Sequence, residues 1–352
     1  QLFGSVGKTC SVFRQETGRL FAGFRIEDIT EGVDDDDGAH LQISGLCTVK
    51  AETGFYGAFH AVQLTCCGTG TAADPYKIGT PAQLAWFASV VNGTQTGAEK
   101  NAAACAKLTA DIDMGAYTYT PMETFSGTFD GNGHTIRNLY FGNDNGPGYE
   151  DPHVSMALVR TNTGTIKNLT FAGRDMDILS GHMAPIAIEN QGTISNCKNT
   201  VNVYSSSGVA GIAVTNEAAG VIEFCSNTGT IGAVNAAMGN TSILGAAGIA
   251  VTNKGTIRDC YNTGSITCAP KLKIYIGQIA GNTTSGSTIQ RCYALGGISN
   301  WGSREEDASN WGGWSGKNPY NHPNNLGSQA GMLAGGVADT SDVFTVNATV
   351  EN

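Results

Sequence analysis

The sequence predicts an all-β solenoid, a stack of similar coils that are each built from short strands. The first observation behind this prediction is a phrase of the type Gly-Thr-Ile-x-x-Cys that returns between residues 160 and 300. Its isoleucines lie 28, 28, 35 and 32 residues apart, at positions 166, 194, 222, 257 and 289. Self-similarity at a period of about 20–50 residues is the signature of a repeat architecture.

The second observation is a run of small and branched residues ahead of each phrase. Residues 211–216 and 248–253 both read Gly-Ile-Ala-Val-Thr-Asn, and residues 277–282 read Gly-Gln-Ile-Ala-Gly-Asn. Short runs of this kind, bounded by Gly and Asn, are typical of strands because branched side chains fit a pleated surface. No segment of this region keeps a 3.6-residue apolar period long enough for a helix. Each repeat is therefore predicted to hold two or three short strands joined by turns.

Stacked coils place equivalent residues above one another at about 4.8 Å, the spacing of paired strands. We expect the five isoleucines to form one column and side-chain amides to form a ladder at a turn, made by Asn199, Asn227 and Asn262. A further column is expected from Leu169, Cys197, Cys225, Cys260 and Cys292. Because Ile and Cys lie three residues apart, both can point inward only if the chain bends between them. The residues placed at this bend include Asn168, Asn196 and Asp259.

These phrases resemble GLUG-motif repeats, which occur in secreted and surface proteins of bacteria. The similarity is clearest at residues 279–294 and 259–266, and residues 74–78 with 125–136 resemble the usual opening of such arrays. It covers about residues 72–300, although Ala-Val replaces the family's second glycine at 213–214 and 250–251. The resemblance implies a right-handed parallel β-helix and an extracellular or cell-surface location. Members of the family occur beside peptidases, adhesins and glycan-active modules.

The chain divides into four predicted regions. Residues 1–70 form a non-repetitive β-rich region, 71–122 hold a capping helix and the first strands, 123–300 hold the repeats, and 301–352 form an aromatic-rich cap with a terminal strand. The helix is predicted to begin at Thr80-Pro81 and to end at Gly93, and its apolar residues repeat at helical spacing. Such a helix covers the open end of the core and blocks pairing at the edge of the first coil.

Alternating residues predict two strands outside the repeats. Leu108, Ala110 and Ile112 indicate an early strand, and alternation from Phe344 to Val350 indicates a strand at the C-terminus. The terminal strand could cap its own helix or add to the edge of a neighbouring subunit. Both alternatives remain open at the level of sequence.

Composition narrows the classes of function. The net charge is −10, only 14% of residues are charged, and no basic stripe is present, so the chain is not expected to bind nucleic acid or anionic membranes. No apolar run is long enough for membrane insertion. Of the ten cysteines, those of the column are expected to be buried thiols. Disulfides are more to be expected among Cys10, Cys47, Cys66, Cys67, Cys105 and Cys268.

The sequence predicts no catalytic centre and no cofactor. The six histidines lack the spacing of a zinc-peptidase helix, and no nucleophile elbow or phosphate-binding loop is present. Carboxylates gather at Asp144, Glu150 and Asp151, and again at Asp175 and Asp177, but nothing holds two of them at a hydrolytic separation. Structural calcium is conceivable at acidic side chains in loops, namely Asp34, Asp35, Asp36, Asp37, Asp144 and Asp151.

A dense aromatic group offers the one candidate binding site, formed by Trp301, Trp311, Trp314 and Tyr320. These side chains either plug the last coil or form a platform for sugar rings or another apolar ligand. The leading prediction is a non-catalytic, extracellular bacterial surface protein that adheres to or recognises a glycan or a host or partner protein. The alternative is a structural subunit of a surface polymer or filament assembled by strand addition. A polysaccharide-active β-helix enzyme is the third.

Overall fold

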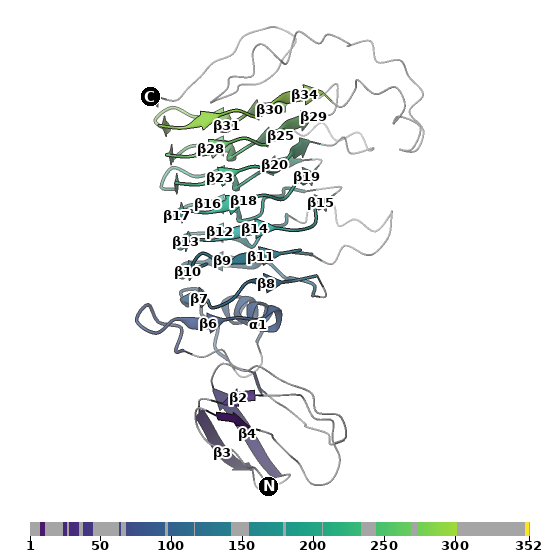
Figure 1. The fold of residues 1–352 in the computed structure, drawn as a ribbon. Helices are drawn as coiled ribbons and strands as arrows, with labels where there is room; N and C mark the ends of the chain where they lie inside the picture. The colour runs from purple at the N-terminus through teal and green to yellow at the C-terminus, as the bar shows by residue number, and fades with distance from the viewer. Residues whose placement is uncertain are drawn as a thin grey trace.

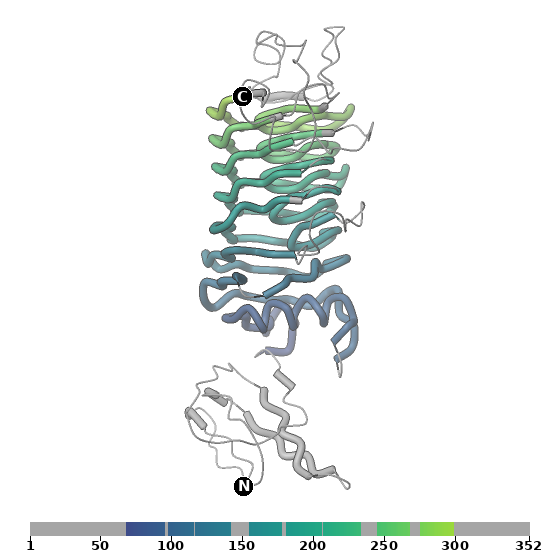
Figure 2. The backbone as a smooth tube through the Cα atoms, turned by 90° about the vertical axis from the view of Figure 1, so that its right-hand side faces the viewer, coloured from purple at the N-terminus to yellow at the C-terminus, as the bar shows by residue number. Residues whose placement is uncertain are grey.

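The computed structural model describes the chain as a parallel β-helix with one helix at its base. It describes the backbone of residues 8–10, 24–26, 28–34, 38–44, 63–64 and 349–351, and residues 68–95, 98–115, 117–141, 155–178, 181–205, 207–233, 244–268 and 274–300. Figures 1 and 2 show the coils of residues 68–300 stacked along one axis, with α1 beneath the first of them. The predicted fold class is confirmed.

Five parallel sheets run along the stack, and each coil contributes one strand to most of them. The nine-stranded sheet holds β6 (Tyr76–Ile78), β7 (Ala106–Leu108), β10 (Thr128–Asp130), β13 (Thr165–Lys167), β17 (Thr193–Ser195), β22 (Val221–Glu223), β27 (Thr256–Arg258), β32 (Thr288–Gln290) and β35 (Thr349–Glu351). The seven-stranded sheet holds β8 (Ile112–Asp113), β11 (Thr135–Arg137), β14 (Thr170–Ala172), β18 (Lys198–Asn199), β23 (Ser226–Asn227), β28 (Tyr261–Asn262) and β33 (Tyr293–Ala294).

The other three sheets complete the coil. The six-stranded sheet holds β9 (Met122–Phe125), β12 (Val159–Asn162), β16 (Ala187–Asn190), β21 (Ala213–Asn216), β26 (Ala250–Asn253) and β31 (Ala280–Thr283). The five-stranded sheet holds β15 (Met176–Ile178), β19 (Val203–Ser205), β24 (Ile231–Ala233), β29 (Ile266–Cys268) and β34 (Ile298–Asn300). A three-stranded sheet holds β20 (Gly208–Ala210), β25 (Leu244–Ala247) and β30 (Ile274–Gly277).

The core is built from columns of inward-facing residues. The predicted isoleucine column is confirmed, since Ile166, Ile194, Ile222, Ile257 and Ile289 are consecutive partners in the nine-stranded sheet and all are buried. Phe129 extends the column below, as the partner of Ile166. In-register stacking gives every coil the same inward positions, so buried apolar side chains recur in each column, with isoleucine at five successive coils.

The predicted bend between Ile and Cys is also confirmed. At the corner between the nine- and seven-stranded sheets, one residue per coil adopts a left-handed backbone conformation with φ between 48° and 56°, at Asn168, Asn196, Phe224, Asp259 and Arg291. This single residue turns the chain and lets the following residue point inward again. We call these five residues the corner column.

Helix α1 (Pro81–Asn92) forms where the sequence predicts it. The hydroxyl of Thr80 accepts a hydrogen bond from the Gln83 amide at 3.2 Å, and Gly93 ends the helix with φ of 75°. Phe87 is buried, and its ring lies 6.2 Å from that of Phe125 and 6.0 Å from that of Phe129. The helix therefore closes the base of the core, as expected.

Three expectations outside the repeats are corrected or refined. Leu108 and Ile112 belong to two strands, β7 and β8, because the chain turns between them from the nine-stranded to the seven-stranded sheet. Cys105, expected among the disulfides, is a buried free thiol. At the C-terminus, β35 pairs in parallel with β32 of its own chain, which is one of the two alternatives left open.

The remaining described strands lie in the N-terminal region. β3 (Asp28–Asp34) pairs antiparallel with β4 (Gly38–Ser44), β5 (Gln63–Leu64) pairs with β4, and β1 (Lys8–Cys10) pairs with β2 (Phe24–Ile26). No helix in the described part of the chain is both long and apolar enough to cross a membrane.

Candidate recognition surface

The binding and calcium residues predicted from sequence fall largely outside the described residues. This applies to the aromatic group Trp301, Trp311, Trp314 and Tyr320 and to the acidic residues Asp35, Asp36, Asp37, Asp144, Glu150 and Asp151. Asp34 is the last residue of β3, where the backbone alone is described. Within the described ranges, no three or more His, Cys, Asp or Glu side chains gather in a way that could hold a metal ion. The prediction of structural calcium therefore stays a prediction.

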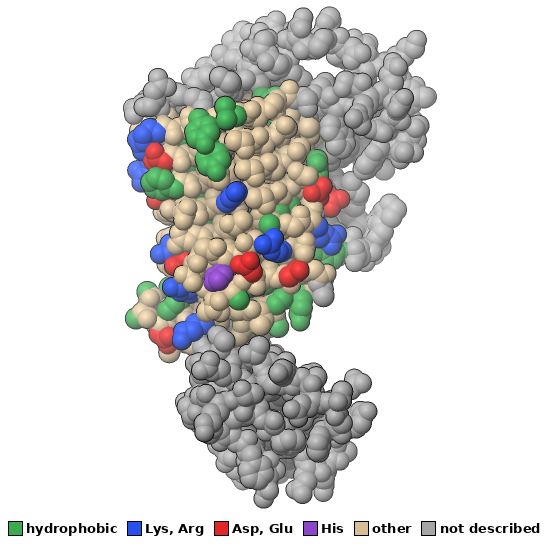
Figure 3. All heavy atoms as spheres, in the orientation of Figure 1, with side chains coloured by type: hydrophobic (Ala, Val, Ile, Leu, Met, Phe, Trp, Pro, Cys, Tyr) green, Lys and Arg blue, Asp and Glu red, His purple; other side chains and the backbone are tan. Residues whose placement is uncertain are grey.

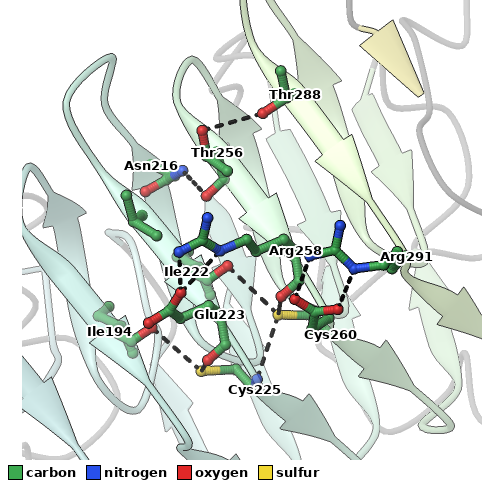
Figure 4. Close-up of polar contacts among 12 residues, drawn as sticks. Ile194, Asn216, Ile222, Glu223, Cys225, Thr256, Arg258, Cys260, Thr288 and Arg291 are labelled. Atoms are coloured by element: carbon green, nitrogen blue, oxygen red, sulfur yellow. Dashed lines mark hydrogen bonds and ion pairs between the residues drawn. The ribbon is translucent and has the colours of Figure 1, made fainter. Parts of the chain in front are cut away.

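Several carboxylates on the coils link one coil to the next. Glu217 lies 2.8 Å from the Lys254 ammonium, and Glu223 lies 2.5 Å from the Arg258 guanidinium one coil further along, the latter pair being drawn in Figure 4. Asp175, in the carboxylate group noted from sequence, accepts a hydrogen bond from the Asn202 amide at 3.0 Å. Each of these carboxylates has a donor on a neighbouring coil, which is a structural arrangement rather than a pair of acids facing a substrate.

The cysteine column lies directly behind the corner and serves the backbone. The Cys225 thiol donates to the carbonyls of Glu223 at 3.2 Å and Ile194 at 3.6 Å, and Cys260 repeats the pattern with Arg258 at 3.1 Å and Ile222 at 3.7 Å (Figure 4). Burial raises the pKa of both thiols well above the ordinary value. These cysteines are therefore unreactive thiols that add a weak hydrogen bond to carbonyls at the bend, where the Glu223 and Arg258 carbonyls also accept backbone amides of the coil below.

The prediction of buried, unbridged thiols is confirmed for three members of the column. Cys197, Cys225 and Cys260 are buried and free. Cys292, at the last coil, is free but only partly buried, because fewer coils lie above it.

Two amide ladders stiffen the coil. The predicted ladder is confirmed: Asn199 donates to Asn227, and Asn227 to Asn262, each at 2.7 Å between buried side chains. A second ladder, not predicted, joins the last residues of strands in the six-stranded sheet at 2.8 Å per step, through Asn162, Asn190, Asn216 and Asn253. The Asn that ends each strand phrase was the signal for it.

The outward face of the seven-stranded sheet carries an exposed apolar group. One column of consecutive partners on this face runs through Lys198, Ser226, Tyr261 and Tyr293. The rings of Tyr261 and Tyr293 are stacked, with centroids 5.0 Å apart and planes within 5°. Tyr293 is 52% exposed and Leu295, two residues on, is 77% exposed. Figure 3 shows hydrophobic side chains gathered over the upper coils of this face. We call Tyr261, Tyr293 and Leu295 the tyrosine patch.

A further exposed aromatic side chain lies at the edge of the same sheet. Phe224 belongs to the corner column and is 58% exposed. It lies two residues before Ser226, whose partner on the next coil is Tyr261. Apart from Tyr117 near the base, the large exposed apolar side chains of the described residues thus gather around the upper half of one sheet. Contiguous exposed apolar surface is typical of binding sites, whereas scattered apolar residues are ordinary.

Sequence reasoning missed the tyrosine patch and Phe224, although a signal was present. Each tyrosine directly follows a cysteine of the inward column, so it must point outward. Phe224 occupies the position that holds Asn in the two preceding repeats. The repeat reveals the inward columns, whereas the exposed aromatic side chains occupy outward positions between them.

The fold is similar to a solved structure from Bacteroides ovatus that is named "putative immunoglobulin A1 protease". The two share 17% sequence identity, with a TM-score of 0.52, over 81% of this chain and 76% of that one. At this identity the likeness shows the β-helix fold alone. No family model and no curated protein matches the chain. The resemblance to GLUG-motif repeats accordingly stays a prediction.

Proposed function

We propose that this chain is a non-catalytic, extracellular bacterial surface protein that recognises a glycan or a partner protein. The observation that carries this proposal is the tyrosine patch on the seven-stranded sheet. Aromatic side chains that combine an apolar body with a hydroxyl dominate binding surfaces, because they offer contact area and hydrogen bonds at small entropic cost.

The surroundings of the patch suit a polar ligand. The outward positions in line with Leu295 on the coils below are the exposed threonines Thr200, Thr228 and Thr263. The backbone amides of Thr228, Thr263 and Leu295 each donate to the backbone carbonyl of an Asn on the coil below. These hydrogen bonds fix the register of the three residues. The hydroxyls of Thr200 and Thr228 donate to backbone carbonyls of the coil below, at 2.8 and 3.3 Å, so they offer acceptors along a regular track beside the aromatic rings. A ligand lying along the helix axis would meet apolar contacts on one side of this track and hydrogen-bonding groups on the other.

Two features favour recognition over catalysis and over polymer assembly. Glu217 and Glu223 are each bound to a cation on the next coil, which suits a scaffold better than acid–base chemistry. Polymer assembly by strand addition needs an open edge, and in the nine-stranded sheet β35 of the same chain occupies the edge of β32. The predicted aromatic group remains part of the proposal as a second contact, made by Trp301, Trp311, Trp314 and Tyr320.

The test compares binding of purified variants to an oligosaccharide array and to immobilised host-surface extract. Tyr293→Ser and Leu295→Ser should each weaken binding by about 1–3 kcal/mol, because each removes an exposed anchor without touching the core. Tyr117→Ser is the matched control, since Tyr117 is an exposed aromatic residue outside the patch. Unchanged binding by the double variant, with an unchanged melting temperature, would exclude the patch as the binding surface.

A further inference from the structure

Phe224 breaks a conformational rule at an exposed position. Its φ is 52°, a left-handed conformation that Asn and Asp tolerate and that bulky residues adopt only as outliers. The two preceding members of the corner column are Asn168 and Asn196, and the next is Asp259. The ring gains little from burial, since it is 58% exposed. Arg291, on the last described coil, has the same conformation, so the corner imposes it on successive coils and Phe224 is the exposed apolar side chain that bears its cost.

Phe224 also interrupts a ladder of hydrogen bonds along the corner. The Asn196 amide donates to Asn168 Oδ1 at 2.8 Å, and the Asn168 amide donates to Asp130 Oδ1 at 2.9 Å. An asparagine at 224 would continue the series by donating to Asn196 Oδ1. With phenylalanine there, no described side chain donates to Asn196 Oδ1, and Asn196 is exposed. An unused acceptor therefore lies one coil below the ring.

A second acceptor lies one coil above the ring. The Asp259 carboxylate receives two hydrogen bonds from the Arg291 guanidinium, at 2.6 and 2.7 Å, and this ion pair holds the carboxylate in place. The same contact lowers the pKa of Asp259, so the group is charged at neutral pH. Each carboxylate oxygen keeps a further lone pair for a ligand donor.

We propose that Phe224, Asn196 and Asp259 form a subsite for a neutral pyranose ring. The inference rests on the proposed recognition function and deepens it by naming the ligand class. The C–H face of the sugar lies on the Phe224 ring, one hydroxyl donates to Asn196 Oδ1 and another donates to the Asp259 carboxylate. Two strand spacings, about 9–10 Å, separate the two acceptors' coils, which leaves room for one ring with a hydrogen bond of about 2.8 Å at each side.

The chemistry of the corner favours a sugar over a protein surface. A protein interface concentrates its energy in buried apolar pockets with several neighbouring apolar contacts. Here an exposed ring occupies the corner of one coil, and the corners of the coils below and above carry an acceptor each, a pattern that matches a ligand with an apolar face and hydroxyl donors at its rim. A glycan seated at Phe224 would reach the tyrosine patch on the next coil, because Tyr261 is the partner of Ser226.

The decisive variant is Phe224→Asn, which replaces the ring with the residue type of the two coils below. It should raise the melting temperature by relieving strain and extending the ladder, while lowering sugar affinity at least tenfold. The oligosaccharide array first identifies a ligand. Binding of the methyl pyranosides of glucose, galactose and mannose is then measured by saturation-transfer NMR. Asn196→Ala should also weaken binding, and Tyr117→Ser should leave it unchanged.

The outcomes separate this inference from the proposed function. If wild type binds an oligosaccharide, Tyr293→Ser weakens it and Phe224→Asn does not, the subsite is wrong and the recognition function stands. The subsite is also wrong if no methyl pyranoside or oligosaccharide binds, or if Phe224→Asn abolishes capture of a protein alone. If Phe224→Asn loses sugar binding while melting at or above the wild-type temperature, the subsite is supported.

Discussion

At the scale of single residues, the last coil shows how neighbouring positions compensate one another. The buried amide ladder ends at Asn262, whose partner on the next coil is Ala294 rather than another Asn. One coil below, residue 248 must be a glycine, because a Cβ atom at this position would lie 2.4 Å from the Asn262 side chain. Gln278 stands at the equivalent position of the last coil, accepts a hydrogen bond from Asn262 and donates to the Gly297 carbonyl at 3.1 Å. The Gln278 amide therefore supplies the acceptor for Asn262 that an Asn at position 294 would otherwise provide.

Removing this amide should destabilise the upper end of the helix. We expect Gln278→Ala to cost about 1–3 kcal/mol in unfolding free energy, because a buried donor of Asn262 loses its partner. The double variant Gln278→Gly with Ala294→Asn should recover most of the loss by extending the ladder itself. Chemical denaturation measures both, and additive losses in the double variant would contradict the compensation.

His182 should make stability depend on pH. Its Nδ1 accepts a hydrogen bond from the Gly208 amide at 2.9 Å, and burial lowers its pKa below the ordinary 6.5. Between the lowered folded pKa and the unfolded value the unfolded chain binds more protons, so stability falls as the pH drops below 6.5. We therefore expect a lower unfolding free energy at pH 5 than at pH 7. His182→Gln should reduce the difference in unfolding free energy between pH 5 and pH 7, measured by chemical denaturation. An unchanged difference would contradict the assignment of this pH dependence to His182.

At the scale of elements, no strand of the coils is long enough to be stable alone. Most have two to four residues, so their stability comes from pairing with the coils above and below. The cysteine column adds a second tie, because each thiol donates to a carbonyl of its own coil and weakly to one of the coil below. Coils are thus held together by side chains as well as by the backbone.

A charge in this column should be far more damaging than a lost contact. Cys225→Asp should cost about 4 kcal/mol or more, because it buries an unpaired carboxylate, whereas Cys225→Ala should cost about 1 kcal/mol. The thiols themselves are tested by alkylating denatured, unreduced protein and analysing it by mass spectrometry. Labelling is expected at Cys197, Cys225, Cys260 and Cys292, and finding all four in disulfides would contradict the column.

The elements that sequence could predict are those repeated on every coil. Inward positions must match from coil to coil, so the isoleucine, cysteine and asparagine columns were visible as a period. Outward positions are under no such constraint. The column of Lys198, Ser226, Tyr261 and Tyr293 changes type at nearly every step, and no period announces it. The tyrosine patch became apparent only once strand register was known, because no repeat marks it, whereas the helix α1 was predicted from its own caps.

At the scale of the whole molecule, the β-helix is nearly one-dimensional. Each coil contacts the coils directly above and below it, and the nine- and seven-stranded sheets run unbroken from β6 and β8 near the base to the last described coil. In such an array stability is close to a sum of nearest-neighbour terms, so damage at one end need not reach the other. The tyrosine patch lies on the upper coils, remote from α1 at the base. Binding and closure of the base are therefore expected to be separable.

Phe87→Ala tests this separation. Phe87 is buried against Phe125 and Phe129, and its loss should cost about 3–5 kcal/mol at the base. In hydrogen exchange followed by mass spectrometry, β7, β10 and β11 should exchange faster, while strands from β17 to β32 keep wild-type protection. Ile222→Ala, in the middle of the stack, is the comparison and should raise exchange on both sides of its coil. A uniform rise in exchange throughout the stack in Phe87→Ala would show that the β-helix unfolds as one cooperative unit, and binding at the tyrosine patch would then depend on the helix at the opposite end.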